Sequence, residues 1–187
     1  MTPAGAFRQV LDALDALQIP YLVCGSIASS VHGVPRATRD IDMVAAIRSE
    51  HVDRLAAALS GDFYADSHMM HEAISHNRAF NVIHLASAYK FDVFPAADDA
   101  YVRAQFERRR LRRSSVEGEE VQFQVASAED TILAKLVWYK TGGSVSEQQW
   151  RDVVSVVETQ RSRLDLLYLR QWAAYLGVSD LMEQALR

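Results

Sequence analysis

Two aspartates stand inside a short apolar run, and this pattern constrains how the segment can fold. Asp40 and Asp42 alternate with Ile41 and Met43 in "DIDMV". Alternate residues of a β-strand point to the same face, with their Cα atoms about 6.6 Å apart. Two carboxylates on one face repel each other and resist burial unless a positive group compensates them. The segment therefore predicts a strand whose polar face meets basic side chains or a divalent cation such as Mg²⁺, which prefers oxygen ligands.

A third acid has a similar setting. Asp92 lies between apolar residues in "KFDVF", where a carboxylate is costly unless it is paired or binds a metal. One alternative is an ion pair with Lys90 on the same strand face. If the two strands lie side by side, Asp40, Asp42 and Asp92 converge, and such a set can hold two metal ions about 3.5–4 Å apart. A site of this kind activates a hydroxyl and steadies the phosphates of a nucleotide.

The pair Gly25-Ser26 closes the preceding apolar run, "YLVC". Glycine lets the backbone approach a phosphate closely, and a helix that begins at Ser26 would direct free N–H groups and the positive end of its dipole at the same anion. Two basic residues, Arg36 and Arg39, follow before the aspartates. They either neutralise the aspartates or contact a triphosphate, and the sequence leaves both interpretations open.

The periodicity of apolar residues predicts strands followed by helices. We expect strands at 21–24, 40–47, near 63, and at 80–85, 90–94 and 121–125, and helices at 5–17, 26–32, 49–59, after 67, and at 98–108, 128–139, 147–157 and twice within 164–186. This order favours an α/β or α+β fold with a C-terminal helical bundle. We expect one compact protein, with a core at 1–125 and a helical region at 126–187.

Composition limits the function classes. The formal net charge is −4, which argues against non-specific coating of nucleic acid but not against a local basic patch. Cys24 is the only cysteine, so no internal disulfide can form, and this suits a reducing cytoplasm. The N-terminal segment has the pattern of an amphipathic helix rather than a signal peptide, and we expect no membrane span.

Several motifs together resemble a known family. Gly25-Ser26, then thirteen residues, then Asp40-Ile41-Asp42, with a later strand acid at Asp92, resemble the nucleotidyltransferase superfamily that includes DNA polymerase β. The wider string "HGVPRATRDIDMV" resembles more narrowly the AbiEii-type toxins and their neighbours, among them the minimal and antibiotic-modifying nucleotidyltransferases. The segments "SAEDTILAKLVWYK" and "WRDVV" are similar to the helical element of that group.

The resemblance implies an enzyme that moves a nucleoside monophosphate from an NTP, such as ATP, to an acceptor hydroxyl and releases pyrophosphate. It implies a short mixed sheet with flanking helices as the nucleotidyltransferase-type fold, and Mg²⁺ or Mn²⁺ as cofactor. In this interpretation Asp40, Asp42 and Asp92 bind the metal. Asp92 also acts as the base for the acceptor hydroxyl, or helps to position that base. Gly25, Ser26, Arg39 and Lys135 would hold the nucleotide, and Asp152 would be the later acid of the motif.

The acceptor stays open at this point. A tRNA or a protein is plausible for a toxin of a toxin–antitoxin pair, which would have a cognate antitoxin as partner. The run "ERRRLRR", with arginines from Arg108 to Arg113, is either the solvated end of a helix or a contact for an RNA backbone. A small molecule such as an antibiotic is a competing acceptor. A non-catalytic nucleotide-binding or toxin–antitoxin partner protein on the same scaffold is the alternative from another class.

Overall fold

The structure is a computed structural model in which residues 2–187 are described. The chain forms two compact units. The sheet unit contains the described residues up to Val23 together with Thr38–Val125, and the helical unit contains Cys24–Ala37 together with Ala126–Arg187. Each unit is described separately below.

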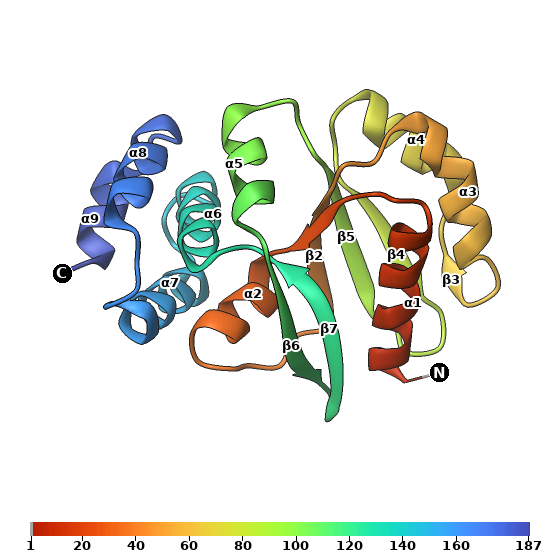
Figure 1. The fold of residues 1–187 in the computed structure, drawn as a ribbon, viewed down its shortest axis with the longest axis horizontal. Helices are drawn as coiled ribbons and strands as arrows, with labels where there is room; N and C mark the ends of the chain where they lie inside the picture. Colours follow the sequence, from red (N-terminus) through yellow and green to blue (C-terminus); the bar gives the residue numbers. More distant parts are fainter. Residues whose placement is uncertain (1) are drawn as a thin grey trace. The chain divides into compact units, whose positions relative to one another are not determined.

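The sheet unit is built on a single seven-stranded mixed sheet (Figure 1). Its strands are β1 (Tyr21–Val23), β2 (Asp40–Ala45), β3 (Phe63–Tyr64), β4 (Phe80–His84), β5 (Lys90–Pro95), β6 (Arg110–Val116) and β7 (Glu119–Val125). Their order across the sheet is β3-β4-β5-β2-β1-β7-β6. The pairs β2–β5 and β1–β7 are parallel, and the other pairs are antiparallel. The two strands with aspartates, β2 and β5, are therefore neighbours at the centre of the sheet.

Helices cover the apolar face of this sheet and form its core. They are α1 (Pro3–Ala16), α3 (Ser49–Leu59) and α4 (Ser67–Ser75), and a further helix of this unit, α5 (Ala100–Arg108), follows β5. Phe7 of α1 is fully buried, with its ring 5.9 Å from that of Phe91 and 5.2 Å from that of Phe123, between ring centroids. Phe91 belongs to β5 and Phe123 to β7, so α1 packs across the sheet and contacts strands from both of its halves. Burial of these rings fixes which face of the sheet is apolar.

The helical unit consists of α2 (Gly25–His32), α6 (Ala128–Thr141), α7 (Glu147–Gln160), α8 (Leu166–Tyr175) and α9 (Ser179–Ala185). Side chains cap three of these helices, since Ser127, Ser146 and Asp165 accept hydrogen bonds from the first-turn N–H groups of α6, α7 and α8. The short helix α2 packs against both α6 and α7. A Cβ atom on Gly33, just after α2, would lie 2.5 Å from Ser155 Oγ of α7, so this close approach requires glycine.

The predicted fold class is confirmed: the protein has a mixed α/β architecture in which helices follow the last strand. Residues 24–37 group with the C-terminal helices and not with the sheet, although they precede the boundary expected after residue 125. The physical reason is the packing of α2 on α6 and α7. No helix in the described part of the chain is long and apolar enough to cross a membrane.

The interpretation of the arginine run as a helix end was wrong for most of its length. Residues 110–116 form β6, which pairs along its whole length with β7. The turn between them contains Glu117 and Gly118, with φ values of 47° and 87°. Two consecutive positive φ angles are typical of the type I′ turn that closes a tight hairpin. The run of charge concealed the strand, although charged side chains are a common protection of edge strands such as β6.

The burial pattern predicts which leucines stabilise the sheet unit. Leu22 on β1 is fully buried, whereas Leu85 after β4 is 63% exposed. Leu22→Ala is expected to lower the free energy of unfolding by about 2–5 kcal/mol, because it leaves a cavity in a packed site. Leu85→Ala removes the same atoms at the surface and is expected to change the free energy of unfolding by less than about 0.5 kcal/mol. Urea unfolding of both variants measures the difference, and equal effects would contradict this account of the core.

Candidate functional site

The acids of β2 and β5 meet on one face of the sheet unit. In the register of these parallel strands, Asp42 lies directly opposite Asp92, and Asp40 lies opposite Lys90. The alternate residues of both strands, Ile41, Met43, Phe91 and Val93, are buried on the other face. The expectation that the two strands lie side by side is therefore confirmed, and two carboxylates occupy adjacent positions on neighbouring strands.

Basic and amide groups compensate these acids. Lys90 Nζ lies 2.9 Å from Asp92 Oδ2 and 3.5 Å from Asp40 Oδ1. The pKa of Lys90 is raised, first by its hydrogen bond to Asp92 and further by the charges of Asp92 and Asp40, against a smaller opposing effect of burial. From β4, the amide nitrogen of Asn81 donates a hydrogen bond to Asp92 Oδ1. The ion pair between Lys90 and Asp92, one of the sequence alternatives, is thus present.

The carboxylates of β2 and β5 meet part of what a divalent metal requires. Mg²⁺ is usually held by one or two protein carboxylates, with water and substrate phosphates as the other ligands. The adjacent pair Asp42 and Asp92 supplies such a set. Among residues 2–187, however, no group of three or more His, Cys, Asp or Glu side chains is placed to hold a metal ion. The three-carboxylate group expected with Asp40 is not assembled here, because Asp40 is exposed and approaches Lys90.

The Gly25-Ser26 pair begins α2 in the helical unit, as predicted. Gly25 has a φ of 59°, in the left-handed region that a side chain disfavours. The N-cap residue of α2, Cys24, makes no side-chain capping hydrogen bond. The first-turn N–H groups of this eight-residue helix are therefore not engaged by a cap, which is the arrangement that anion-binding helix termini share.

A buried ionic network lies beside this helix in the same unit. Asp152 of α7 accepts hydrogen bonds from Lys135 Nζ at 2.8 Å, from Gln148 Nε2 at 2.8 Å, and from Arg36 Nε and Nη2 at 3.2 and 3.1 Å. Arg36 Nη2 also donates to Ser26 Oγ. The network therefore connects the first turn of α2 to α6 and α7, and it fixes the position of Ser26.

The structure places the three basic residues that the sequence singled out, Arg36, Arg39 and Lys135. Arg36 pairs with Asp152, so it does not neutralise the strand aspartates. Lys135 is only 1% exposed and its amine is directed at Asp152, and its predicted contact with a triphosphate stays a prediction. Arg39 is exposed in the sheet unit, where its carbonyl accepts a hydrogen bond from the N–H of Lys90. Its role at a triphosphate is likewise untested.

Hydrogen bonds decide the charge state of Asp152. Burial raises the pKa of this carboxyl, but the hydrogen bonds from Arg36, Lys135 and Gln148 and the charge of Lys135 outweigh burial and lower it below its ordinary value of 3.8. Asp152 is therefore ionised at neutral pH, and it compensates the buried charge of Lys135.

The predicted site residues thus fall into two clusters, one in each unit. Asp40, Asp42 and Asp92 belong to the sheet unit, while Gly25, Ser26, Lys135 and Asp152 belong to the helical unit. Sequence reasoning missed Asn81 and Gln148. A lone polar residue between the buried Phe80 and Val82 was a signal for Asn81, and the spacing of four residues to Asp152 on one helix was a signal for Gln148.

Comparisons with known proteins establish the fold. No family model matches this sequence, and a search of curated proteins found no match. Among solved structures, the antibiotic-resistance factor ANT(2'')-Ia in solution is similar over 97% of this chain and 95% of its own, with 18% identity and a TM-score of 0.52. The same factor in complex with adenylyl-2''-tobramycin is similar over 95% and 98%, with 15% identity and a TM-score of 0.55.

A third solved structure belongs to the same fold group. An antigenic nucleotidyltransferase-like protein from Paracoccidioides brasiliensis is similar over 97% of this chain and 91% of its own, with 20% identity and a TM-score of 0.51. The protein therefore has a nucleotidyltransferase-like fold, and the part of the resemblance that concerned the fold is confirmed. At these identities the likeness concerns the fold alone.

The network around Asp152 predicts a large loss of stability when one partner is removed. Asp152→Ala leaves the buried Lys135 uncompensated and is expected to cost about 3–5 kcal/mol of unfolding free energy. The matched control is Glu183→Ala, which breaks the exposed ion pair with Arg170 and is expected to cost less than about 1 kcal/mol. Denaturant unfolding tests both variants. A double variant, Lys135→Met with Asp152→Leu, should recover most of the loss, and a fully additive result would contradict the pairing.

The lowered pKa of Asp152 predicts a pH dependence of stability. A carboxylate whose folded pKa is depressed contributes stability above its unfolded value, near 3.8, and this contribution is lost as the pH falls through the folded pKa. The wild-type protein should therefore lose more unfolding free energy below about pH 4 than Asp152→Asn, in which this titration is absent. Urea unfolding series at several pH values measure both. Parallel curves for the two proteins would show that Asp152 is not stabilised as a carboxylate.

Proposed function

We propose that this protein is an NTP-dependent nucleotidyltransferase that transfers a nucleoside monophosphate to an acceptor hydroxyl. The observation that carries the proposal is the register of β2 and β5, which sets Asp42 directly opposite Asp92 in a nucleotidyltransferase-like sheet, on the face away from the buried Phe91. Neutralising the charge of transferring phosphates is the main catalytic task in phosphoryl-type transfer, and paired carboxylates are suited to hold the cations that do so. No other pair of aspartates in this sheet is aligned across two strands.

Asp42 and Asp92 would hold Mg²⁺ or Mn²⁺, and Asp40 would join them once its side chain turns away from Lys90. When bound, such an ion supplies positive charge to the phosphates and lowers the pKa of an oxygen that it contacts. Lys90 has a separate role in this proposal, since its amine compensates the carboxylates while no cation is present. Asn81 orients Asp92 through its hydrogen bond to Oδ1.

The proposed transfer needs no reactant besides the NTP and the acceptor hydroxyl. The acceptor oxygen forms a bond to the α-phosphorus of the NTP, and the bond from that phosphorus to the bridging oxygen of the β-phosphate breaks. Pyrophosphate leaves with the bond's electron pair. Asp92 takes the proton of the acceptor hydroxyl as the general base, or it positions the group that takes this proton. Most of the acceleration would come from positioning and charge neutralisation.

The first turn of α2 is proposed as the phosphate-binding element. The resemblance of the Gly25-Ser26 motif to that of nucleotidyltransferases supports this role, as does the left-handed φ of 59° at Gly25. Arg39 and Lys135 would assist with the triphosphate, Lys135 indirectly through the network that holds Ser26.

The acceptor class is the finer part of the proposal. ANT(2'')-Ia is described in complex with adenylyl-2''-tobramycin, so an antibiotic is one acceptor to test. The narrower resemblance of "HGVPRATRDIDMV" to AbiEii-type toxins makes tRNA or protein the second class, with a cognate antitoxin as partner. Incubation with labelled NTPs, Mg²⁺ and each acceptor class in turn distinguishes them.

A non-catalytic nucleotide-binding protein is the second candidate, and one specific observation favours it. Lys90 Nζ already satisfies both Asp40 and Asp92, as it would in a scaffold that has no need of a metal. This candidate requires nucleotide binding without pyrophosphate release for every acceptor class. Pyrophosphate release that depends on an added acceptor would exclude it.

The aspartate pair predicts the outcome of substitution. Asp42→Asn and Asp92→Asn keep the size of the side chain but remove the charge, and each is expected to reduce transfer about 10²- to 10³-fold, as removal of one charge-stabilising group does in other enzymes. Asp53→Asn is the matched control, since its side chain on α3 is 81% exposed. Pyrophosphate release measures all three. Wild-type rates in both Asp42→Asn and Asp92→Asn would overturn the assignment.

A further inference from the structure

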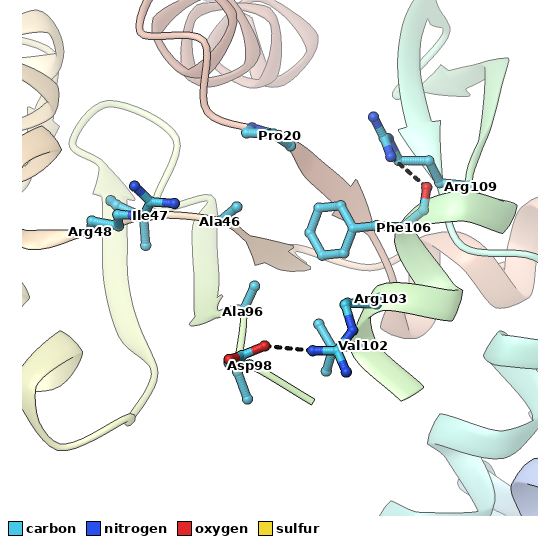
Figure 2. A pocket seen from close by; sticks show the side chains of 11 residues that line it. Pro20, Ala46, Ile47, Arg48, Ala96, Asp98, Val102, Arg103, Phe106 and Arg109 are labelled. Atoms are coloured by element: carbon cyan, nitrogen blue, oxygen red, sulfur yellow. Dashed lines mark hydrogen bonds and ion pairs between the residues drawn. The ribbon is translucent and has the colours of Figure 1, made fainter. Parts of the chain in front are cut away.

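A second site in the sheet unit lies beyond the aspartates. A cavity of about 600 Å³ opens where β2 and β5 end (Figure 2). Pro20, Ala46 and Ala96 line its apolar part, and α5 contributes Val102 and Phe106. The volume is in the range of ligand-binding pockets. Figure 2 shows the ring of Phe106 directed from α5 toward Ala46, so an aromatic surface faces the open space.

This cavity continues the face that carries the aspartates. Side chains alternate along a strand, so Ala46 lies on the face of Asp42, and Ala96 lies on the face of Asp92. The ladder extends to these positions, because Ala46 N–H donates to Pro20 at 2.8 Å and Ala96 N–H donates to Ala45 at 2.8 Å. Four residues of strand correspond to about 13 Å. The cavity and the aspartate pair are therefore two places along one surface of the sheet.

The charge around the cavity is mainly positive. Arg48, Arg103 and Arg109 line it, and Asp98 is the acid among the lining residues. Arg48 and Arg103 have side-chain exposures of 77% and 62%, and each is paired with one acid, Glu50 and Asp98 respectively. Each guanidinium has five N–H donors, so Arg103 keeps donors available beyond its ion pair with Asp98. An anionic ligand therefore matches the charge of the rim.

The positive charge extends past the cavity along the edge of the sheet. Arg109 is followed directly by β6, the edge strand, on which Arg110, Arg112 and Arg113 are all exposed. The guanidinium groups of Arg110 and Arg112 contact only backbone carbonyls among the hydrogen bonds described for residues 2–187. A small anion would occupy the cavity alone. Side chains alternate along β6, so Arg113, opposite Gln122, lies on the aspartate face, whereas Arg110 and Arg112 lie on the other face. An arginine on the same face beyond the cavity matches a polyanion, which carries several charges along its length.

Phe106 and Arg109 give the cavity a stacking surface. The guanidinium of Arg109 lies over the ring of Phe106, 5.5 Å from its centroid, and Arg109 Nη1 donates to the carbonyl of Phe106. Aromatic rings and guanidinium planes are the surfaces on which proteins stack unpaired bases. Arginines beside such a ring then bind the adjoining phosphates.

We propose that this cavity and Arg113 of β6 form a binding site for a single-stranded polynucleotide, with one base on Phe106 and the phosphates along Arg103, Arg109 and Arg113. The inference adds to the proposed function by naming the acceptor class. A stacked strand rises about 3.4 Å per nucleotide, so about four nucleotides separate the cavity from the aspartates. The terminal hydroxyl of a strand held at Phe106 can then reach Asp42 and Asp92.

The test is equilibrium binding of a labelled single-stranded RNA of about twelve nucleotides, without NTP or metal, by fluorescence anisotropy. The dissociation constant should rise with salt, with a logarithmic slope of about 2–3, as for about three or four phosphate contacts on a single strand. Phe106→Leu should weaken binding about ten-fold with the slope unchanged, while Phe106→Trp keeps wild-type affinity. Arg113→Ala should lower the slope by about 0.7. Arg54→Ala, at an exposed arginine on α3, is the matched control.

Three results would overturn the inference: a dissociation constant that does not change with salt, binding that neither Phe106→Leu nor Arg113→Ala affects, or equal competition by an acidic peptide of matched charge. Thermal unfolding of each variant separates loss of binding from loss of fold.

The proposed function and this binding site can fail independently of each other. RNA binding that persists without any transfer refutes the enzyme but not this site, whereas transfer to an antibiotic without RNA binding refutes this site alone.

Discussion

The alignment of Asp42 with Asp92 is the constraint on which the functional account depends. It arises because β2 and β5 are adjacent and parallel, and because Phe7 of α1 packs on the opposite face, where Phe91 is buried. A shift of the pairing by one residue would exchange the two faces of a strand and bury its carboxylate in the aromatic core. The energy of the hydrophobic core thus fixes the position of the charged groups. Lys90 and Asn81 then compensate a cluster that would otherwise repel itself.

The helical unit depends on a second ionic arrangement of a different kind. Lys135 and Asp152 are almost completely buried, with side-chain exposures of 2% and 6%, and a pair in such a place is maintained only when its remaining hydrogen bonds are satisfied. Arg36 and Gln148 satisfy them, and Arg36 also holds Ser26 at the start of α2. The lysine that the family resemblance assigns to the nucleotide therefore acts in this structure as part of the support for the Gly25-Ser26 turn.

Much of this architecture could be predicted from the sequence, for identifiable reasons. Alternation in "DIDMV" and "KFDVF" revealed both central strands, and Ser127 and Ser146 marked the beginnings of α6 and α7. The edge strand β6 could not be recognised, because its arginines remove the apolar alternation that defines a strand, and only pairing with β7 reveals it. The grouping of α2 with α6 and α7 was also out of reach, since it depends on packing between segments about a hundred residues apart. The pairing of Asp152 with Arg36 could not be predicted either, because these two residues are also far apart in the sequence.

The central claim is that Asp42 and Asp92 together hold a divalent cation when a nucleotide is bound. Electron paramagnetic resonance of Mn²⁺, titrated into the protein with a non-hydrolysable NTP analogue, tests this claim directly, because free and bound Mn²⁺ give different signals. The account predicts saturable Mn²⁺ binding in the wild type that is lost or at least about ten-fold weaker in both Asp42→Asn and Asp92→Asn. Mn²⁺ binding of unchanged affinity in these two variants would contradict it.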